Sequence, residues 1–213
     1  MTSAHTHSSR HFVRRREDAI TVALGLVVLA LGMLAVRNGT VTGFEKSVFH
    51  AVNDLPQAFY PVLWPFQQLG VLVVGPIAAI IAALFRKFRL ALALLIATVA
   101  KLGLERVVKQ MVSRQRPGTS VGHDVHLRGD VSVSGESFVS GHALLAAAIA
   151  CLVVPYLKGR WKLVAWAVLG LVMVTRVYVG AHNPLDVICG AALGLALGGC
   201  LNLAFGVPNP NAE

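Results

Sequence analysis

Charged side chains are scarce in this chain. Of its 213 residues only 14% are charged, whereas 55% are hydrophobic, and the mean hydropathy is +0.67. A soluble domain carries about 25% charged residues, so the composition excludes an ordinary soluble globular domain. A membrane-spanning helix needs about 20 apolar residues. The chain is therefore long enough for one integral membrane domain with several spans.

Acidic residues and cysteines are also few. The chain has 10 acids against 19 bases, which gives a formal net charge of +9. The bases lie in short clusters between apolar runs, a pattern typical of membrane topology signals rather than of nucleic-acid binding. No cluster of acids indicates Mg²⁺ or Zn²⁺, so we expect no metal, no cofactor and no nucleic-acid partner. The cysteines Cys151, Cys189 and Cys200 are odd in number and lie inside apolar runs, which predicts small core residues rather than disulfides or metal ligands.

Six apolar runs predict six transmembrane helices. The runs are 19–36, 66–85, 90–104, 142–157, 163–179 and 185–205. We therefore predict an all-α fold, a polytopic membrane helix bundle over residues 19–206. Residues 1–18 are predicted to be a disordered cytoplasmic tail and 207–213 a short C-terminal tail. Residues 37–65 are predicted to form a loop with a short surface helix.

The distribution of bases predicts the orientation of the bundle. If the N-terminus is cytoplasmic, the cytoplasmic segments hold ten bases: four in the tail, three in "RKFR" and three in "KGRWK". On the other side, residues 37–65 carry no net charge, and residues 105–140 carry five bases and four acids. The positive-inside rule therefore favours both termini inside. It also places three polar stretches together outside the cytoplasm.

The first polar stretch is "KQMVSRQRP", residues 109–117. Lys101, Glu105 and Lys109 are spaced by four residues, so on one helix they share a face and can pair. Lys109, Arg114 and Arg116 then cluster near the outer surface of the membrane. Bases that extend from a helix end towards water would give the same pattern, but on this side positive charge should be rare.

The second polar stretch is "ESFVSGHA", residues 136–143. Ser140 is a good N-cap for the fourth span, and Gly141 and His142 fall in its first turn, where backbone N–H groups have no helical partner. Such a helix N-terminus favours anion binding. Helix capping alone would explain the serine and the glycine but not His142.

The third polar stretch is "TRVYVGAHNPLD", residues 175–186. Asn183 is predicted to cap the sixth span, with Pro184 at the first helical position and Asp186 near the third. The carboxylate of Asp186 is predicted to reach Nδ1–H of His182, which would leave Nε2 free as a nucleophile. A stripe of small residues that favours close helix packing continues along the same helix face: Gly190, Gly194 and Gly198.

Together the three stretches predict a phosphoryl site. Polar residues at membrane depth are costly and usually functional. Three cations and free backbone N–H groups suit a doubly charged tetrahedral anion, and two histidines supply a nucleophile and a proton donor. Phosphoryl transfer depends mainly on positioning and charge stabilisation. The predicted site residues are Lys109, Arg116, Arg176, Ser140, Gly141, His142, His182 and Asp186.

The order and spacing of these residues resemble a known signature. Lys109 precedes Arg116-Pro117, then Ser140-Gly141-His142 follows, and then Arg176, His182 and Asp186. This three-part pattern resembles that of the type 2 phosphatidic acid phosphatase superfamily, whose site is similar to that of the vanadium haloperoxidases. The chain departs from the family pattern at two positions, with Val139 where proline is usual and Thr175 where serine is usual.

The resemblance implies a role for each site residue. His182 would attack phosphorus to form a phosphohistidine, Asp186 would orient it, and His142 would protonate the leaving oxygen. No metal or cofactor is implied. The residues implied to hold the phosphoryl oxygens are Lys109, Arg116, Arg176, Ser140 and Gly141.

The resemblance also implies a multi-pass protein of the plasma membrane that hydrolyses a lipid phosphate monoester or diphosphate on the extracytoplasmic face. Its implied partners are the bilayer and its lipid substrate. Our first expectation is polyprenyl (undecaprenyl or decaprenyl) diphosphate. Phosphatidic acid, phosphatidylglycerol phosphate and a lipid-linked sugar phosphate are the alternatives. A non-enzymatic protein that binds anionic lipid headgroups would need the bases but not the histidines. A transporter should show broken helices and a site at mid-membrane.

Overall fold

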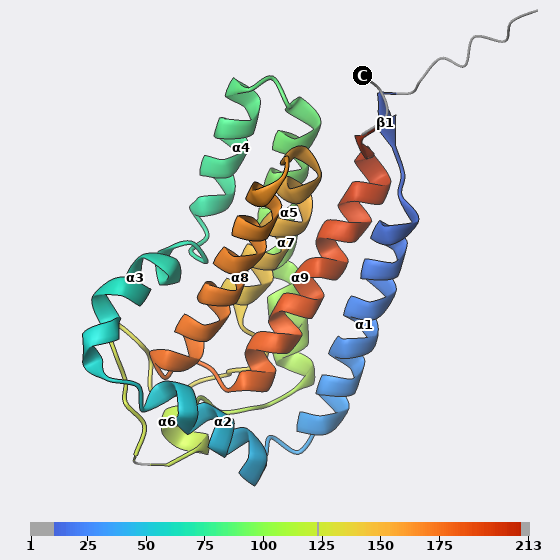
Figure 1. Cartoon of the computed structure of the whole chain (residues 1–213). Coiled ribbons are helices and arrows are strands. Elements are labelled where there is room, and N and C mark those ends of the chain that lie inside the picture. Colours follow the sequence, from blue (N-terminus) through green and yellow to red (C-terminus); the bar gives the residue numbers. More distant parts are fainter. Residues whose placement is uncertain (1–10, 123, 210–213) are drawn as a thin grey trace, which may run out of the picture.

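The computed structural model describes residues 11–122 and 124–209 and is mostly helical (Figure 1), as the sequence predicts. The elements in chain order are β1 (Phe12–Val13), α1 (Arg16–Val36), α2 (Gly43–Asn53), the 3₁₀ turn η1 (Gln57–Phe59), α3 (Tyr60–Gln68), α4 (Val74–Leu84), α5 (Phe88–Met111), α6 (Pro117–Ser120), α7 (Gly141–Val153), the 3₁₀ turn η2 (Val154–Tyr156), α8 (Arg160–Tyr178), α9 (Pro184–Phe205) and β2 (Val207–Pro208).

Three helices in the described part of the chain, α1, α8 and α9, are long and apolar enough to cross a membrane. α5 has 24 residues but carries several charges. α4 and α7 are apolar but have only 11 and 13 residues. The predicted run 66–85 is divided, since α3 ends at Gln68 and α4 begins only at Val74. Six spans with both termini inside therefore remain a prediction.

The surface of the bundle is suited to a membrane. Large apolar side chains are exposed along its helices, for example Leu31 in α1, Leu84 in α4 and Leu163 in α8. This surface and the apolar helices identify a membrane protein. The prediction that all three cysteines are core residues is correct for Cys151 and Cys189 but wrong for Cys200, which is exposed.

The core of the bundle is built around α7. Alanines on α7 pack against α8 and α9 on one side and against α5 on the other. The glycines of α9 allow its close approach, because a Cβ added to Gly190 would lie 2.4 Å from the Ser140 carbonyl oxygen, and one added to Gly194 would lie 2.1 Å from that of Leu144. The small-residue stripe thus allows the predicted close packing of α9, and the structure shows that its partner is α7.

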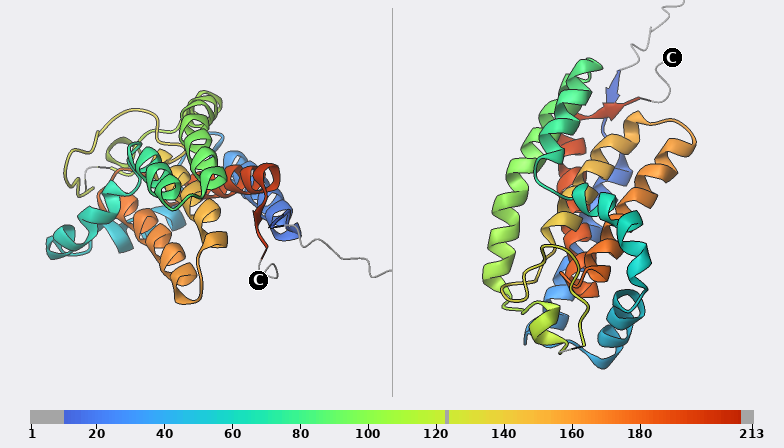
Figure 2. Two further views of the ribbon diagram at one scale, coloured as in Figure 1. Left: turned by 90° about the horizontal axis from the view of Figure 1, so that it is seen from above. Right: turned by 90° about the vertical axis from the view of Figure 1, so that its left-hand side faces the viewer.

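The two ends of the bundle differ in structure (Figures 1 and 2). At one end, here called the β1 end, β1 pairs with β2 in antiparallel fashion. At the other end, here called the site end, α2, α6 and the loop segments 121–122 and 124–140 cover the starts of α7 and α9. Of the predicted tail 1–18, residues 1–10 lie outside the described part, and Asp18 is buried. Residues 210–213 of the predicted C-terminal tail also lie outside it.

Candidate active site

The three polar stretches meet at the site end of the bundle. The backbone N–H of Ser140 donates to the carbonyl oxygen of Asp186 at 2.9 Å, which joins the second stretch to the third. Arg116 Nη1 donates to the carbonyl oxygen of Ala181 at 3.3 Å, which joins the first stretch to the third. The convergence predicted from the sequence is therefore present in the fold.

The start of α9 has the predicted capping arrangement. Asn183 is the N-cap, Pro184 is the first helical residue and Asp186 is the third. Asp186 Oδ2 accepts a hydrogen bond of 2.8 Å from the backbone N–H of Asn183. The cap fixes the Asp186 carboxylate at the N-terminus of the helix, where a negative charge is favoured.

His182 contacts Asp186 indirectly. Its Nδ1 lies 3.0 Å from the carbonyl oxygen of Ser137 but 4.0 Å from Asp186 Oδ2. The hydroxyl of Ser137 donates to that same Oδ2 at 2.5 Å. The structure therefore replaces the predicted direct hydrogen bond with a relay through Ser137, because Oδ2 already accepts from Ser137 and Asn183. Donation from Nδ1–H to a carbonyl still leaves Nε2 as the basic nitrogen.

Arg114 is a part of the site that the sequence did not assign to it. Its side chain is fully buried, and Nη1 donates to Asp186 Oδ1 at 2.6 Å. Nη2 donates to the carboxylate of Glu45 in α2, and Glu45 Oε1 accepts from the backbone N–H of Leu185 at 3.0 Å. The ion pairs thus connect α2 to the start of α9. Arg114 was visible as one base of the first stretch, but no sequence pattern links it to Glu45.

The start of α7 offers polar groups that other residues do not use. Ser140 is the N-cap, as predicted, but its side chain makes no capping hydrogen bond and its buried Oγ has no partner among the described residues. His142 follows in the first turn and packs against Gly70, where an added Cβ would lie 2.5 Å from the His142 Cβ. The turn between α3 and α4 thereby fixes the position of His142.

Two of the predicted phosphate-binding cations, Arg116 and Arg176, each have a buried Nε atom. Arg176 is only 7% exposed, and the Nε atoms of Arg116 and Arg176 have no hydrogen-bond partner among the described residues. Buried donors are paired in most proteins, so such atoms indicate a place where a ligand binds. On α5 the predicted pairing is confirmed: Glu105 accepts from Lys109 at 2.7 Å and from Lys101 at 2.7 Å.

Burial and nearby charges shift the pKa values of His182 and Arg116, two site residues that lie in loops. The pKa of His182 lies well below its ordinary value because the ring is buried and because Arg176, Arg116 and Lys109 place positive charge near it. Burial also lowers the pKa of Arg116. His182 is therefore neutral at neutral pH, which is the form that can act as a nucleophile. Within 11–122 and 124–209 the side chains form no group of three or more potential metal ligands.

Comparisons with known proteins converge on one family. The family model of the PAP2 superfamily matches residues 69–207, a range that includes every predicted site residue. The undecaprenyl-diphosphatase of Sulfolobus acidocaldarius is 35% identical over 121 residues, 56% of this chain. The match spans 57% of that relative, little more than half of its length.

Two solved structures are similar to this chain. LpxE from Aquifex aeolicus has a TM-score of 0.64 and 27% sequence identity, over 71% of this chain and 90% of that one. A transmembrane PAP2-type phosphatidylglycerolphosphate phosphatase from Bacillus subtilis has a TM-score of 0.65 and 24% identity, over 88% of this chain and 95% of that one. This last likeness concerns the fold alone.

Proposed function

Because the chain belongs to the PAP2 superfamily, we propose that it is an integral membrane phosphatase that hydrolyses the phosphate monoester or diphosphate of a lipid through a phosphohistidine. The observation that carries this proposal is the combination at the site end. A buried, neutral His182 lies in the field of three cations. Arg116, Arg176 and Ser140 each have a buried polar atom with no partner in the part of the chain that the structure describes.

In the first step, Nε2 of His182 attacks phosphorus and the bond from phosphorus to the leaving oxygen breaks. His142 gives a proton to that oxygen. The positive charge that develops on the His182 ring is stabilised by the Ser137 carbonyl, which accepts from Nδ1, and by the nearby Asp186 carboxylate. In the second step, water attacks the phosphohistidine, His142 takes a proton from that water, and inorganic phosphate leaves.

The phosphoryl oxygens would be held by Lys109, Arg116, Arg176, the Ser140 hydroxyl and the Gly141 N–H. Ser140 and Gly141 lie at the N-terminus of α7, where free N–H groups and the helix dipole favour an anion. Lys109 and Arg176 lie in the last turns of α5 and α8 and contribute their side-chain charge. Donors fixed before the reaction stabilise the charge of the transition state without reorganisation. The proposal therefore includes no metal ion.

The surroundings of His142 support a lipid as the leaving group. An apolar groove of about 180 Å³ between α4, α7 and α8 is lined by residues such as Leu69, Ala146 and Val172. Leu69 directly precedes Gly70, on which His142 packs. A lipid tail in this groove would bring its ester oxygen towards the proposed acid.

Polyprenyl diphosphate is the substrate that we favour, because the relative from Sulfolobus acidocaldarius is an undecaprenyl-diphosphatase. A lipid-linked sugar phosphate, phosphatidic acid and phosphatidylglycerol phosphate are the alternatives, and the Bacillus subtilis phosphatase of similar fold is named for the last of these. We place the site outside the cytoplasm and the chain in the plasma membrane, since the positive-inside rule puts "RKFR" and "KGRWK" inside. The proposed phosphatase domain is residues 19–206, with six spans.

The proposal is tested by phosphate release from the purified protein in detergent with EDTA present. Polyprenyl diphosphate, phosphatidic acid and phosphatidylglycerol phosphate are offered in parallel, and His182→Ala is the control. We expect release by the parent protein and none by the variant. Activity that disappears with EDTA would contradict the metal-free reaction. Tight binding of lipid phosphates by folded protein without any release would instead favour a headgroup-binding protein.

A further inference from the structure

α5 carries more charge inside the bundle than the proposed reaction uses. Lys109 belongs to the predicted phosphate-binding set, but Lys101 and Glu105 do not. Their side chains are largely buried, with exposed fractions of 13% and 19%. Charged groups at membrane depth are costly and are usually kept for a function.

The carboxylate of Glu105 links the two lysines to the start of α7. Oε1 pairs with Lys109 Nζ and Oε2 pairs with Lys101 Nζ, both at 2.7 Å. Oε2 also packs on Gly141, because a Cβ added there would lie 2.2 Å from it. The ammonium of Lys101 therefore contacts the same carboxylate oxygen that packs on Gly141, the residue before His142.

Lys101 lies on the inner side of this site. Its Cα precedes that of Lys109 by two helical turns, about 12 Å along α5 at ~1.5 Å per residue. Its ammonium approaches Glu105 from that side, and the ammonium of Lys109 approaches from the other. The direction from Lys109 to Lys101 leads from the site end towards the middle of the bundle, as does the apolar groove that begins near His142. Lys101 is thus on the side of His142 where the leaving group and its lipid tail would lie.

We propose that Lys101, held in place by Glu105, is a specificity-determining residue that binds the lipid-linked phosphate of a diphosphate substrate. The inference rests on the proposed function and specifies its substrate class. An ammonium has three donors, and Glu105 takes one of them. When the terminal phosphoryl group moves to His182, the bridging oxygen keeps the bonding electron pair and takes the proton of His142. Lys101 stabilises the remaining phosphate of the leaving lipid monophosphate.

The proposal predicts a difference between two substrates with the same tail. The leaving group of a prenyl monophosphate is an alcohol, which gives Lys101 no anion to bind. In Lys101→Gln we expect kcat/KM for the prenyl diphosphate to fall about tenfold or more, since a hydrogen bond to a charged group is worth ~1.5–3 kcal/mol. For the prenyl monophosphate kcat/KM should change less than about threefold. Lys101→Arg should retain most of the preference for the diphosphate.

Arg37→Gln is the matched control, because Arg37 is an exposed base that follows the last turn of α1 at the same end. It removes the same charge away from the site and should leave both substrates unaffected. An equal loss for both substrates in Lys101→Gln, or no loss for the diphosphate, would overturn the proposal.

A binding measurement separates this proposal from that of the reaction. In a His182→Gln background, the affinity for a prenyl diphosphonate with a methylene bridge is compared with that for the prenyl phosphonate, with and without Lys101→Gln. Only the diphosphonate should bind more weakly, by about tenfold. If the parent acts on monoesters alone and binds both probes equally, the Lys101 proposal fails and the phosphatase proposal stands. If the parent hydrolyses no substrate but Lys101→Gln still weakens binding of the diphosphonate alone, the phosphatase proposal fails and the Lys101 proposal stands.

Discussion

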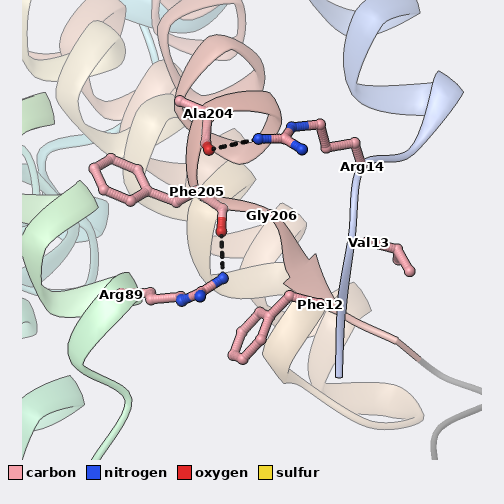
Figure 3. A pocket seen from close by; sticks show the side chains of 7 residues that line it. All are labelled: Phe12, Val13, Arg14, Arg89, Ala204, Phe205 and Gly206. Atoms are coloured by element: carbon pink, nitrogen blue, oxygen red, sulfur yellow. Dashed lines mark hydrogen bonds between the residues drawn. The ribbon is translucent and has the colours of Figure 1, made fainter. Parts of the chain in front are cut away.

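Both ends of the bundle contain arginines, but the arginines at the two ends have different partners. At the β1 end, Arg14 Nε donates to the carbonyl oxygen of Leu203 at 2.7 Å, and Arg89 Nη1 donates to that of Phe205 at 3.1 Å. Figure 3 shows both arginines converging on the last turn of α9. Arg15 pairs with the buried Asp18 at 3.0 Å. These cations satisfy free carbonyls and a carboxylate, which stabilises helix ends.

At the site end the arginines leave donors unused. Among the described residues, the buried side-chain atoms without a partner are Gln67 Oε1, Arg114 Nε, Arg116 Nε, Ser140 Oγ, Arg176 Nε and Asn183 Oδ1. None of these residues belongs to the β1 end. An unpaired buried donor costs about 1–3 kcal/mol, so the site end gives up stability to keep groups available for a ligand. The number of arginines does not identify a site, whereas their unsatisfied donors do.

The largest expected effect in this comparison is that of His182→Ala. The change removes the proposed nucleophile, so phosphate release should fall by at least about 10³-fold. Thermal unfolding in detergent should remain close to that of the parent, because the relay between Ser137 and Asp186 does not require the ring.

A matched control for this change is His126→Ala, in a loop at the same end, whose side chain is 60% exposed. It should retain activity. Substantial turnover by His182→Ala would eliminate the covalent step and with it the proposed mechanism.

The next largest effect should come from Arg114→Met. Removal of this side chain leaves the carboxylates of Asp186 and Glu45 buried without their shared cation, which costs about 3–5 kcal/mol of unfolding free energy. Activity should fall with it, since Asp186 would lose its position. Thermal unfolding and phosphate release measure the two effects.

Arg89→Met at the β1 end is the contrast for that prediction. Its guanidinium is exposed, donates to one carbonyl and lies over the Phe12 ring at 4.3 Å. Exposed contacts of this kind are weak, so the loss should be about 1 kcal/mol. Equal destabilisation by the two changes would remove the distinction between the ends.

The sequence predicts the site where its interactions are local. The Lys101–Glu105–Lys109 pairing and the start of α9 at Asn183 follow from spacings of one helical turn, and the structure has both. Ser140 takes the predicted N-cap position of α7, but its side chain makes no capping hydrogen bond. Family resemblance adds the order of the three stretches but no contacts between them.

Features that depend on distant parts of the chain were not predictable. Arg114 meets Glu45 across 69 residues, and Ser137 meets Asp186 across 49. The run 66–85 is divided by a turn at Gly70, and this turn packs against His142 from a distant part of the chain. Periodicity describes one helix at a time, so it cannot show where two elements exclude each other's side chains.

Gly70→Ala tests that contact at the site end. The new Cβ would lie 2.5 Å from the His142 Cβ and 2.6 Å from its Cδ2, so the proposed acid must move. We expect kcat for a lipid phosphate to fall about 10- to 100-fold, within the range of general acid catalysis. Activity towards an aryl phosphate, whose leaving group needs no proton, should fall much less. Gly103→Ala on α5 meets no atom within 4 Å and should affect neither substrate.

The cations of the site end should also affect how kcat depends on pH, because they change the pKa of His182. The pKa of His182 is lowered by burial and by Arg176, Arg116 and Lys109, so the ring stays neutral as the pH falls through the ordinary histidine value of about 6.5. The acid limb of kcat should therefore lie below that value. Lys109→Gln removes one positive charge and should raise the limb. Two substrates with different phosphate pKa values separate substrate ionisation from that of His182. A limb at or above pH ~6.5 would contradict the assignment.

The smallest effect is expected at the β1 end, from the double change Arg14→Gln and Arg89→Gln. The hollow in Figure 3 lies beside these two arginines, next to Phe12 and Gly206. Both guanidinium groups already bond carbonyl oxygens of α9, so their removal should change phosphate release by less than about twofold and unfolding by about 1 kcal/mol at most. Arg116→Gln, a single loss of charge at the site end, should lower phosphate release by about 100-fold or more. A large loss of turnover from the β1 end would show that its arginines also act on the reaction, and the partners of a guanidinium would then no longer separate structural from functional arginines in this fold.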